Sequence, residues 1–237
     1  WIRRWPAPPG PTGMGEGTAR SPATGSRRRL RATLLIPTYE RPEDLARCLG
    51  SILVQTRLPD EVLVIDDGHL ERVPHRATLE AAGVRIVYRR KERPGVTESR
   101  NLGIELATGD VVFFSEDDVE LFPDYVLRIM AVFEGDPEGR IGGVGGLIDN
   151  ERRGPMRHVL RLLLFVPRRL SALREGRLLR SGFAGEYGES LLPIRARKRV
   201  DFMIGGVCAV RRSCLNGIRF SSRYRSLSGY GQMEDKD

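Results

Sequence analysis

Short apolar runs alternate along this chain with longer stretches in which apolar residues recur at every third or fourth position. The runs at residues 31–36, 61–65 and 111–115 predict buried strands, because each is short and is followed by turn-forming or acidic residues. A further strand is predicted over residues 84–88, where apolar and polar residues alternate. Strands separated by helices favour right-handed crossovers. The pattern therefore predicts an α/β fold, with helices on both sides of a mainly parallel sheet.

The stretches between these strands have the apolar spacing of amphipathic helices. The first helix is expected to begin at Pro42, since proline suits a first helical turn and the acids Glu43 and Asp44 suit the positive end of the helix dipole. The predicted helices cover residues 42–53, residues 70–82 with an interruption at Pro74, residues 97–107 and a segment that starts near Pro123. Regular structure is expected again over residues 200–210, and a short helix at Ser213.

Acidic residues follow three of the predicted strands. Pro37 ends the first strand and leads to Glu40, the second strand runs into Asp67, and the third runs into three acids at 116–118. Parallel strands end at one edge of a sheet, which is where open α/β sheets bind their ligands. Three consecutive carboxylates repel one another unless a cation lies among them. The sequence therefore predicts a metal site at this edge.

The chain carries 39 Lys and Arg residues against 31 Asp and Glu residues, a formal charge of +8. This balance favours acidic partners such as nucleotides, phosphates, nucleic acid or an anionic membrane surface. Almost all of the basic residues are arginine, so a coding bias explains the charge equally well. Three cysteines without CxxC spacing argue against a disulfide framework and against a zinc site.

No apolar run is long enough to span a bilayer, and no secretion signal is visible. We therefore expect a cytoplasmic protein, with peripheral contact at the inner face of the membrane as a possibility. Residues 159–166 are apolar apart from Arg161 and are flanked by arginines, which suits a membrane-surface helix, although an ordinary helix that covers the core is favoured.

Two parts of the chain lack the alternating pattern. Residues 1–29 are rich in Pro, Gly, Ser and Arg and are predicted to form a disordered basic tail. After the glycine-rich run at residues 141–146 the pattern weakens, and residues 147–199 interrupt the strand and helix alternation. The remainder is expected to belong to one domain, residues 30–237.

Two common phosphate-binding loops, GxxxxGK followed by Ser or Thr and GxGxxG after the first strand, are absent from the sequence. The first strand runs instead into PTYERP, which contains no glycine whose backbone could approach a phosphate. Phosphate charge would then be balanced most simply by a divalent cation held on carboxylates.

Four segments carry a resemblance to a known family: IPTYERPEDLARCLGSILVQT, EVLVIDDG, GVTESRNLGIELATGDVVFFSEDDVEL and the terminal GYGQMEDKD. In this order they resemble the successive signatures of family 2 glycosyltransferases, over residues 31–237. The resemblance implies a GT-A fold, the nucleotide-diphospho-sugar transferase fold. It also implies that the domain is truncated at its C-terminus, because the family usually continues further.

By this resemblance, residues 116–118 correspond to the DxD region of the family. Asp118 is implied to bind Mg²⁺ or Mn²⁺ at the diphosphate of the donor, and Asp117 to contact the ribose. Glu116 stands where the family more commonly has Asp, which leaves its role as a ribose or metal contact open. A cluster of solvated loop acids is the alternative for all three residues.

Four residues match family positions that hold the nucleotide base: Pro37, Tyr39, Glu40 and Asp67. Asp67 is preferred for the direct contact, because a carboxylate accepts a hydrogen bond from N3–H of uracil or thymine; a turn cap is its alternative. Arg100 matches a basic residue near the diphosphate or base, with a surface arginine as the alternative.

The acceptor side is implied by two segments. Asp235, in the pair Glu234-Asp235, matches the family's general base toward the acceptor hydroxyl, although acids at the start of a final helix would also explain the pair. Gly205 and Gly206 resemble a segment whose backbone lies close to the acceptor, or form an ordinary strand bulge.

The resemblance thus implies an inverting glycosyltransferase that moves a sugar from a nucleoside-diphosphate sugar to a hydroxyl of a polysaccharide or lipid-linked glycan, as in cell-envelope biosynthesis. A sugar-nucleotide-binding module without turnover is an alternative that would keep the acids at 116–118 but would not need Asp235. A nucleic-acid-binding protein is disfavoured, because the basic runs lack aromatic residues on which bases could stack.

Overall fold

The computed structural model describes residues 29–147 and 197–221 of the 237-residue chain. The predicted tail before Arg29 and the helix expected over residues 159–166 lie outside the described residues. In chain order the elements are β1 (Ala32–Thr38), α1 (Pro42–Leu53), β2 (Glu61–Asp66), α2 (Arg76–Ala81), β3 (Arg85–Arg90), α3 (Val96–Leu106), β4 (Val111–Ser115), α4 (Tyr125–Glu134), β5 (Gly143–Gly145), β6 (Val207–Arg211) and the 3-10 helix η2 (Arg212–Leu215). Within the described ranges, no helix has the length and apolar character needed to cross a membrane.

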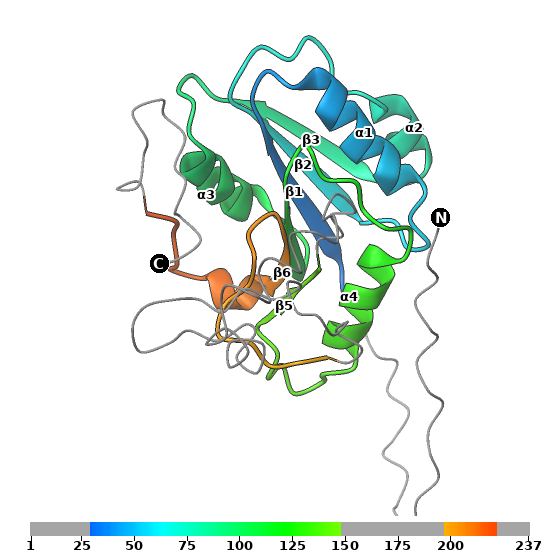
Figure 1. Ribbon diagram of the computed structural model, residues 1–237, viewed down its shortest axis with the longest axis vertical. Helices are drawn as coiled ribbons and strands as arrows, with labels where there is room; N and C mark the ends of the chain where they lie inside the picture. The colour runs from blue at the N-terminus through cyan, green and yellow to red at the C-terminus, as the bar shows by residue number, and fades with distance from the viewer. Residues whose placement is uncertain (1–28, 148–196, 222–237) are drawn as a thin grey trace, which may run out of the picture.

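Six strands form one sheet in the order β3-β2-β1-β4-β6-β5 (Figure 1). β1 lies between β2 and β4 and is parallel to both, and β3 is parallel to β2. β6 runs antiparallel to β4, and β5 runs antiparallel to β6. The sheet is therefore mainly parallel, as the alternation of strands and helices predicts. The central strands β1, β2 and β4 end at the same edge.

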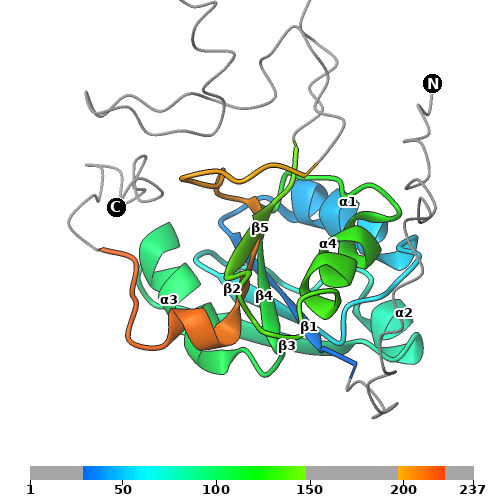
Figure 2. The same ribbon diagram turned by 90° about the horizontal axis from the view of Figure 1, so that it is seen from below.

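Helices cover both faces of this sheet, with α1, α2 and α4 on one side and α3 and η2 on the other (Figures 1 and 2). Successive residues of a strand point to opposite faces, so β1 supplies both cores. Leu34 packs in the cluster that contains Leu49 of α1 and Met130 of α4. Leu35 packs in the second cluster, with Ile104 of α3.

Pro37 does not end the first strand, because β1 continues through it to Thr38. β4 pairs with β1 only as far as Leu35. The missing N–H of Pro37 therefore removes no hydrogen bond between β1 and β4. The extension brings Thr38 to the edge at which the acidic residues lie.

Two other predicted elements differ from those observed, and one observed strand was not predicted. α2 begins only after Pro74, and in the preceding loop the N–H of Leu70 donates to the Asp66 carboxylate at 2.9 Å. β6 begins at Val207, later than the apolar pattern suggests. β5 was not predicted, because three residues rich in glycine show no apolar alternation.

A buried carboxylate joins the elements at the amino-terminal edge of the parallel strands. Glu61, the first residue of β2, has no solvent exposure. It accepts hydrogen bonds from the hydroxyls of Thr33 at 2.7 Å and Thr108 at 3.1 Å. The guanidinium of Arg85 lies 2.7 Å from the same carboxylate and balances its charge. β1, β2, β3 and the turn before β4 are thus connected through one side chain.

Side chains of α1, and of Gln55 just after it, hold the loop between β4 and α4, which begins with the acids at 116–118. The Ser51 hydroxyl accepts a hydrogen bond from the Leu121 N–H at 3.0 Å. The Gln55 amide bonds to backbone groups of residues 121, 122 and 126. The thiol of Cys48 lies 3.5 Å from the carbonyl oxygen of Glu116. The acidic loop is therefore fixed to one face of α1.

Glu61→Ala should lower the free energy of unfolding by about 2–4 kcal/mol, because it removes the charged acceptor of several hydrogen bonds. Urea unfolding followed by circular dichroism measures the change. Glu80→Ala is the matched control, since Glu80 forms an exposed ion pair with Arg76 on α2 and its loss should cost less than about 0.5 kcal/mol. Equal stability of the two variants would contradict the role assigned to Glu61.

The thiol of Cys48 reports whether α1 holds the loop. Burial raises the pKa of Cys48 to about 12, so at pH 8 it should resist alkylation by iodoacetamide, whereas the exposed Cys214 should react. Gln55→Ala leaves backbone groups of the loop unpaired and should raise the Cys48 alkylation rate about tenfold or more. Peptide mass spectrometry measures both thiols in one sample. An unchanged ratio of the two rates would show that Gln55 does not hold the loop.

Candidate functional site

Thr38 connects the predicted acidic residues at the carboxyl edge of the central strands. Its hydroxyl donates a hydrogen bond to the Asp117 carboxylate at 2.8 Å. Its carbonyl oxygen accepts the N–H of Asp67 at 2.9 Å. Because β1 lies between β2 and β4, its last residue contacts the segments that follow both neighbouring strands. The structure thus brings Asp67 and Asp117 together around one residue, as the parallel sheet predicts.

The two aspartates that follow Glu116 have different surroundings. Asp117 is buried, whereas the side chain of Asp118 is 51% exposed. The guanidinium of Arg41, just before α1, lies 3.4 Å from the Asp118 carboxylate and 3.6 Å from that of Asp117. Burial raises the pKa of Asp117, and the Thr38 hydrogen bond and Arg41 oppose this rise. Asp118 is therefore the aspartate that presents its oxygens to solvent.

Glu116 pairs with α3. Its carboxylate lies 3.0 Å from the guanidinium of Arg100, which is only 3% exposed and so is not a surface arginine. The guanidinium also lies 5.3 Å from the centre of the Phe220 ring, and the Asn101 side chain bonds twice to the Phe220 backbone. Gly206 has φ of +77°, and a Cβ there would collide with the Glu116 side chain. Glu116 therefore lies between α3 and the glycine segment before β6.

Asp67 has a fully buried side chain that fixes the loop before α3. It accepts hydrogen bonds from the Gly95 N–H at 2.9 Å and the Ser99 hydroxyl at 2.7 Å. The ammonium group of Lys91 lies 3.0 Å from the same carboxylate and also donates to the Gly95 carbonyl at 2.8 Å. A nucleotide base would reach Asp67 only if this network opened. The contact between Asp67 and a base stays a prediction.

The other residues predicted for base binding lie at the same edge. Pro37 belongs to β1, and Tyr39 and Glu40 follow it, with Tyr39 and Glu40 both exposed. Glu40 has φ of +53°, and a Cβ on Gly68 would lie 2.9 Å from the Glu40 Cγ. The loop after β1 therefore packs closely on the turn after β2.

Two predictions about the chemistry have no structural counterpart. Asp235 and Glu234 lie outside the described residues, so the general base stays a prediction. Within residues 29–147 and 197–221, no three His, Cys, Asp or Glu side chains are grouped so that they could hold a metal ion. A metal bound to Asp118 would therefore be held by ligands other than a group of three such side chains.

Three residues of the site were not singled out from the sequence: Thr38, Arg41 and Lys91. Lys91 could have been noticed, because it is one of three lysines among 39 basic residues. Arg41 could have been noticed as a cation directly after the PTYE segment. The role of Thr38 depends on a contact with a residue 79 positions away, for which the sequence has no signal.

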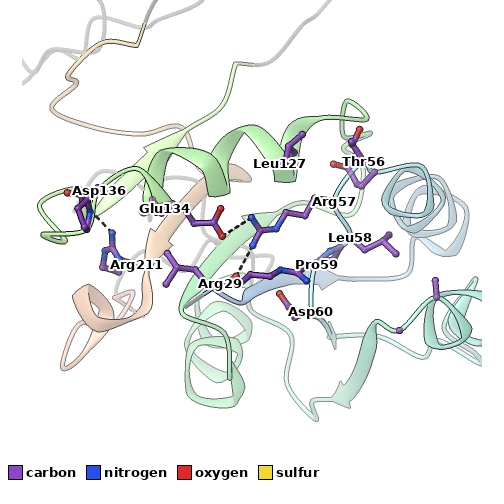
Figure 3. Close-up of a pocket in the computed structure, with 16 residues that line it drawn as sticks. Arg29, Thr56, Arg57, Leu58, Pro59, Asp60, Leu127, Glu134, Asp136 and Arg211 are labelled. Atoms are coloured by element: carbon purple, nitrogen blue, oxygen red, sulfur yellow. Dashed lines mark hydrogen bonds and ion pairs between the residues drawn. The ribbon is translucent and has the colours of Figure 1, made fainter. Parts of the chain in front are cut away.

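A cavity of about 1110 Å³ lies at the opposite edge, among the segments that precede β1, β2 and β3 (Figure 3). Charged side chains pair within it: Arg57 lies 2.9 Å from Glu134, and Arg211 lies 3.3 Å from Asp136. None of the predicted site residues lines this cavity. We therefore place the candidate site at the carboxyl edge of the strands and not in this cavity.

Curated relatives resemble part of this chain. A glucosyl-dolichyl phosphate glucuronosyltransferase of Haloferax volcanii is 29% identical over 119 residues, which are 48% of this chain and 38% of that protein. A validoxylamine A glucosyltransferase of Streptomyces hygroscopicus subsp. limoneus is 32% identical over 113 residues, 46% of this chain and 25% of that protein. The matched regions are thus less than half the length of these relatives.

Solved structures share the fold. The mannosyltransferase PcManGT from Pyrobaculum calidifontis, in complex with GDP-Man and Mn²⁺, gives a TM-score of 0.54 at 17% identity, over 88% of this chain and 50% of that one. S. aureus TarS 1–349, in complex with UDP-GlcNAc, gives a TM-score of 0.53 at 19% identity, over 87% and 51%. At these identities the similarity concerns the fold alone, and it confirms the predicted GT-A architecture.

A family model described as "Glycosyl transferase family 2" matches residues 33–219 of this chain. The match runs from the second residue of β1 past β6, and it includes the strand ends that carry Thr38, Asp67 and Asp118. It therefore includes the described part of the candidate site. Because the match covers most of the chain, this protein belongs to glycosyl transferase family 2.

Proposed function

We propose that this protein transfers a sugar from a nucleoside-diphosphate sugar to an acceptor hydroxyl, with inversion at the anomeric carbon. The observation that carries the proposal is the convergence of Asp67, Asp117 and Asp118 at one sheet edge in a chain of this family. Two proteins of similar fold are in complex with GDP-Man and UDP-GlcNAc, which supports a donor of this class.

Asp118 is the residue that would hold Mg²⁺ or Mn²⁺. Its carboxylate is half-exposed, whereas that of Asp117 is buried against Thr38. Mg²⁺ in phosphate-transfer sites often binds only one or two carboxylates, together with substrate phosphates and water. A single exposed acid fits this mode of binding. A bound divalent ion would supply Lewis-acid stabilisation of the departing nucleoside diphosphate.

Other residues at this edge would position the donor. Arg100, held at 3.0 Å from Glu116, is a fixed positive charge suited to the diphosphate. Asp117 would contact the ribose. Pro37, Tyr39 and Glu40 would border the base, together with Asp67 if its network opens.

The acceptor hydroxyl would attack the anomeric carbon while the bond from that carbon to the diphosphate oxygen breaks. Asp235 would accept the hydroxyl proton as the new bond forms. Such general base catalysis contributes about 10²–10⁴ in rate. A polysaccharide or a lipid-linked glycan is the proposed acceptor class, and the name of the Haloferax relative, which refers to a dolichyl phosphate, supports the lipid-linked form. A lipid-linked acceptor would bring the protein to a membrane surface.

A screen of UDP-, GDP- and dTDP-sugars should find a donor that binds in the presence of Mg²⁺ or Mn²⁺. Asp118→Asn should weaken this binding at least about tenfold, because it removes the charged ligand. Isothermal titration calorimetry measures the affinity. Asp124→Asn is the matched control, since Asp124 is paired with Arg128 on α4 and should bind the donor normally. Donor binding that survives Asp118→Asn unchanged would show that the metal is held elsewhere.

Asp235→Asn should lower kcat by about 10²–10⁴ and leave the donor Kd unchanged, because the amide accepts a proton poorly. Release of nucleoside diphosphate in the presence of candidate acceptors measures turnover. If turnover survives this change, the base is a different residue, and Glu234 and Asp237 are the next to be replaced. A wild-type protein that binds donors but releases nothing with any acceptor would favour the binding module without turnover.

A further inference from the structure

Arg41 lies beside the Asp118 carboxylate that is proposed to hold the metal. It precedes α1, and one guanidinium nitrogen lies within 3.4 Å of the Asp118 carboxylate and 3.6 Å of that of Asp117. A single cationic nitrogen thus lies between the two acids. Without a cation, carboxylates this close would repel one another.

We propose that Arg41 is an internal counter-ion for Asp118, which a divalent metal must displace before it can bind there. This inference rests on the proposed metal-binding function of Asp118. In this role Arg41 opposes binding of the metal alone. The metal is therefore expected to bind together with a nucleoside diphosphate.

The contacts of Arg41 suit an exchange of this kind. Its side chain is 54% exposed, so the guanidinium can move away without leaving a cavity in the core. The ion pair with Asp118 is also exposed, and such pairs contribute little free energy. The counter-ion is therefore weak enough to be displaced when the diphosphate adds further ligands to the metal.

The two aspartates respond differently to the departure of Arg41. Asp117 keeps its hydrogen bond from Thr38 at 2.8 Å and stays buried. Among the described residues, the side chain of Asp118 contacts Arg41. Displacement of Arg41 thus exposes the oxygens of Asp118 without disturbing the end of β1.

Arg47 of α1, six residues after Arg41, provides a matched control. It is 58% exposed and pairs with Asp44 and, at 3.8 Å, with Glu120. Its ion pairs therefore involve neither Asp117 nor Asp118. Arg47→Gln removes the same charge as Arg41→Gln from the same region, so the pair of variants separates a specific contact from a general effect of net charge.

The test is a titration of Mn²⁺ alone into the full chain, in which electron paramagnetic resonance measures the free ion. Arg41→Gln should bind Mn²⁺ about two- to fivefold more tightly than wild type, the range that corresponds to a surface ion pair. Arg47→Gln should match wild type. Arg41→Lys retains a positive charge and should bind Mn²⁺ more weakly than Arg41→Gln. Adding Asp118→Asn to Arg41→Gln should abolish the gain.

The inference would be overturned if Arg41→Gln bound Mn²⁺ no more tightly than wild type. It would also be overturned if Arg41→Gln and Arg47→Gln gained the same Mn²⁺ affinity. The same titration with UDP or GDP present tests the proposed function separately. If nucleotide-dependent Mn²⁺ binding is lost in Asp118→Asn but Arg41→Gln equals wild type, only the counter-ion role fails. If neither nucleotide gives Mn²⁺ binding that depends on Asp118, the metal site and the counter-ion role fail together.

Discussion

The hydrogen bond from the Thr38 hydroxyl to the Asp117 carboxylate fixes the geometry on which the candidate site depends. It forms because β1 lies between β2 and β4 and extends through Pro37 to the common edge. The carbonyl of the same threonine holds the N–H of Asp67. Two segments that are far apart in the sequence are therefore positioned by one residue of the central strand, and the remaining contacts of the site are built around it.

Both helical layers also hold the acidic loop. Ser51 of α1 and Gln55, just after α1, bond to its backbone, and α3 pairs with its first side chain through Arg100. A loop fixed from both sides keeps Asp118 at the edge while leaving its carboxylate half-exposed. This explains why a motif such as SILVQT accompanies the acids in the sequence, since its serine and glutamine position the loop.

The sequence predicted the features that depend on local pattern. Apolar runs identified β2 and β4, and parallel order placed the acids at one edge, because these follow from the periodicity of each element. It did not predict the extension of β1 through Pro37, nor β5, because these depend on pairing with neighbouring strands. The burial of Asp67 also depends on contacts that are distant in the sequence, with Lys91, Ser99 and Gly95. Its position in a predicted turn therefore gave no sign that it is buried.

The length of the Glu116 side chain matches the distance that its contacts span. Glu116 reaches Arg100 at 3.0 Å and passes beside Gly206, where a side chain would collide with it. An aspartate would be shorter by one C–C bond, about 1.5 Å, and would not reach the guanidinium from the same backbone. The three neighbouring acids thus have separate environments: Glu116 pairs with α3, and Asp117 is buried against Thr38. Asp118, which faces solvent beside Arg41, is consequently the acid best suited to exchange one cation for another.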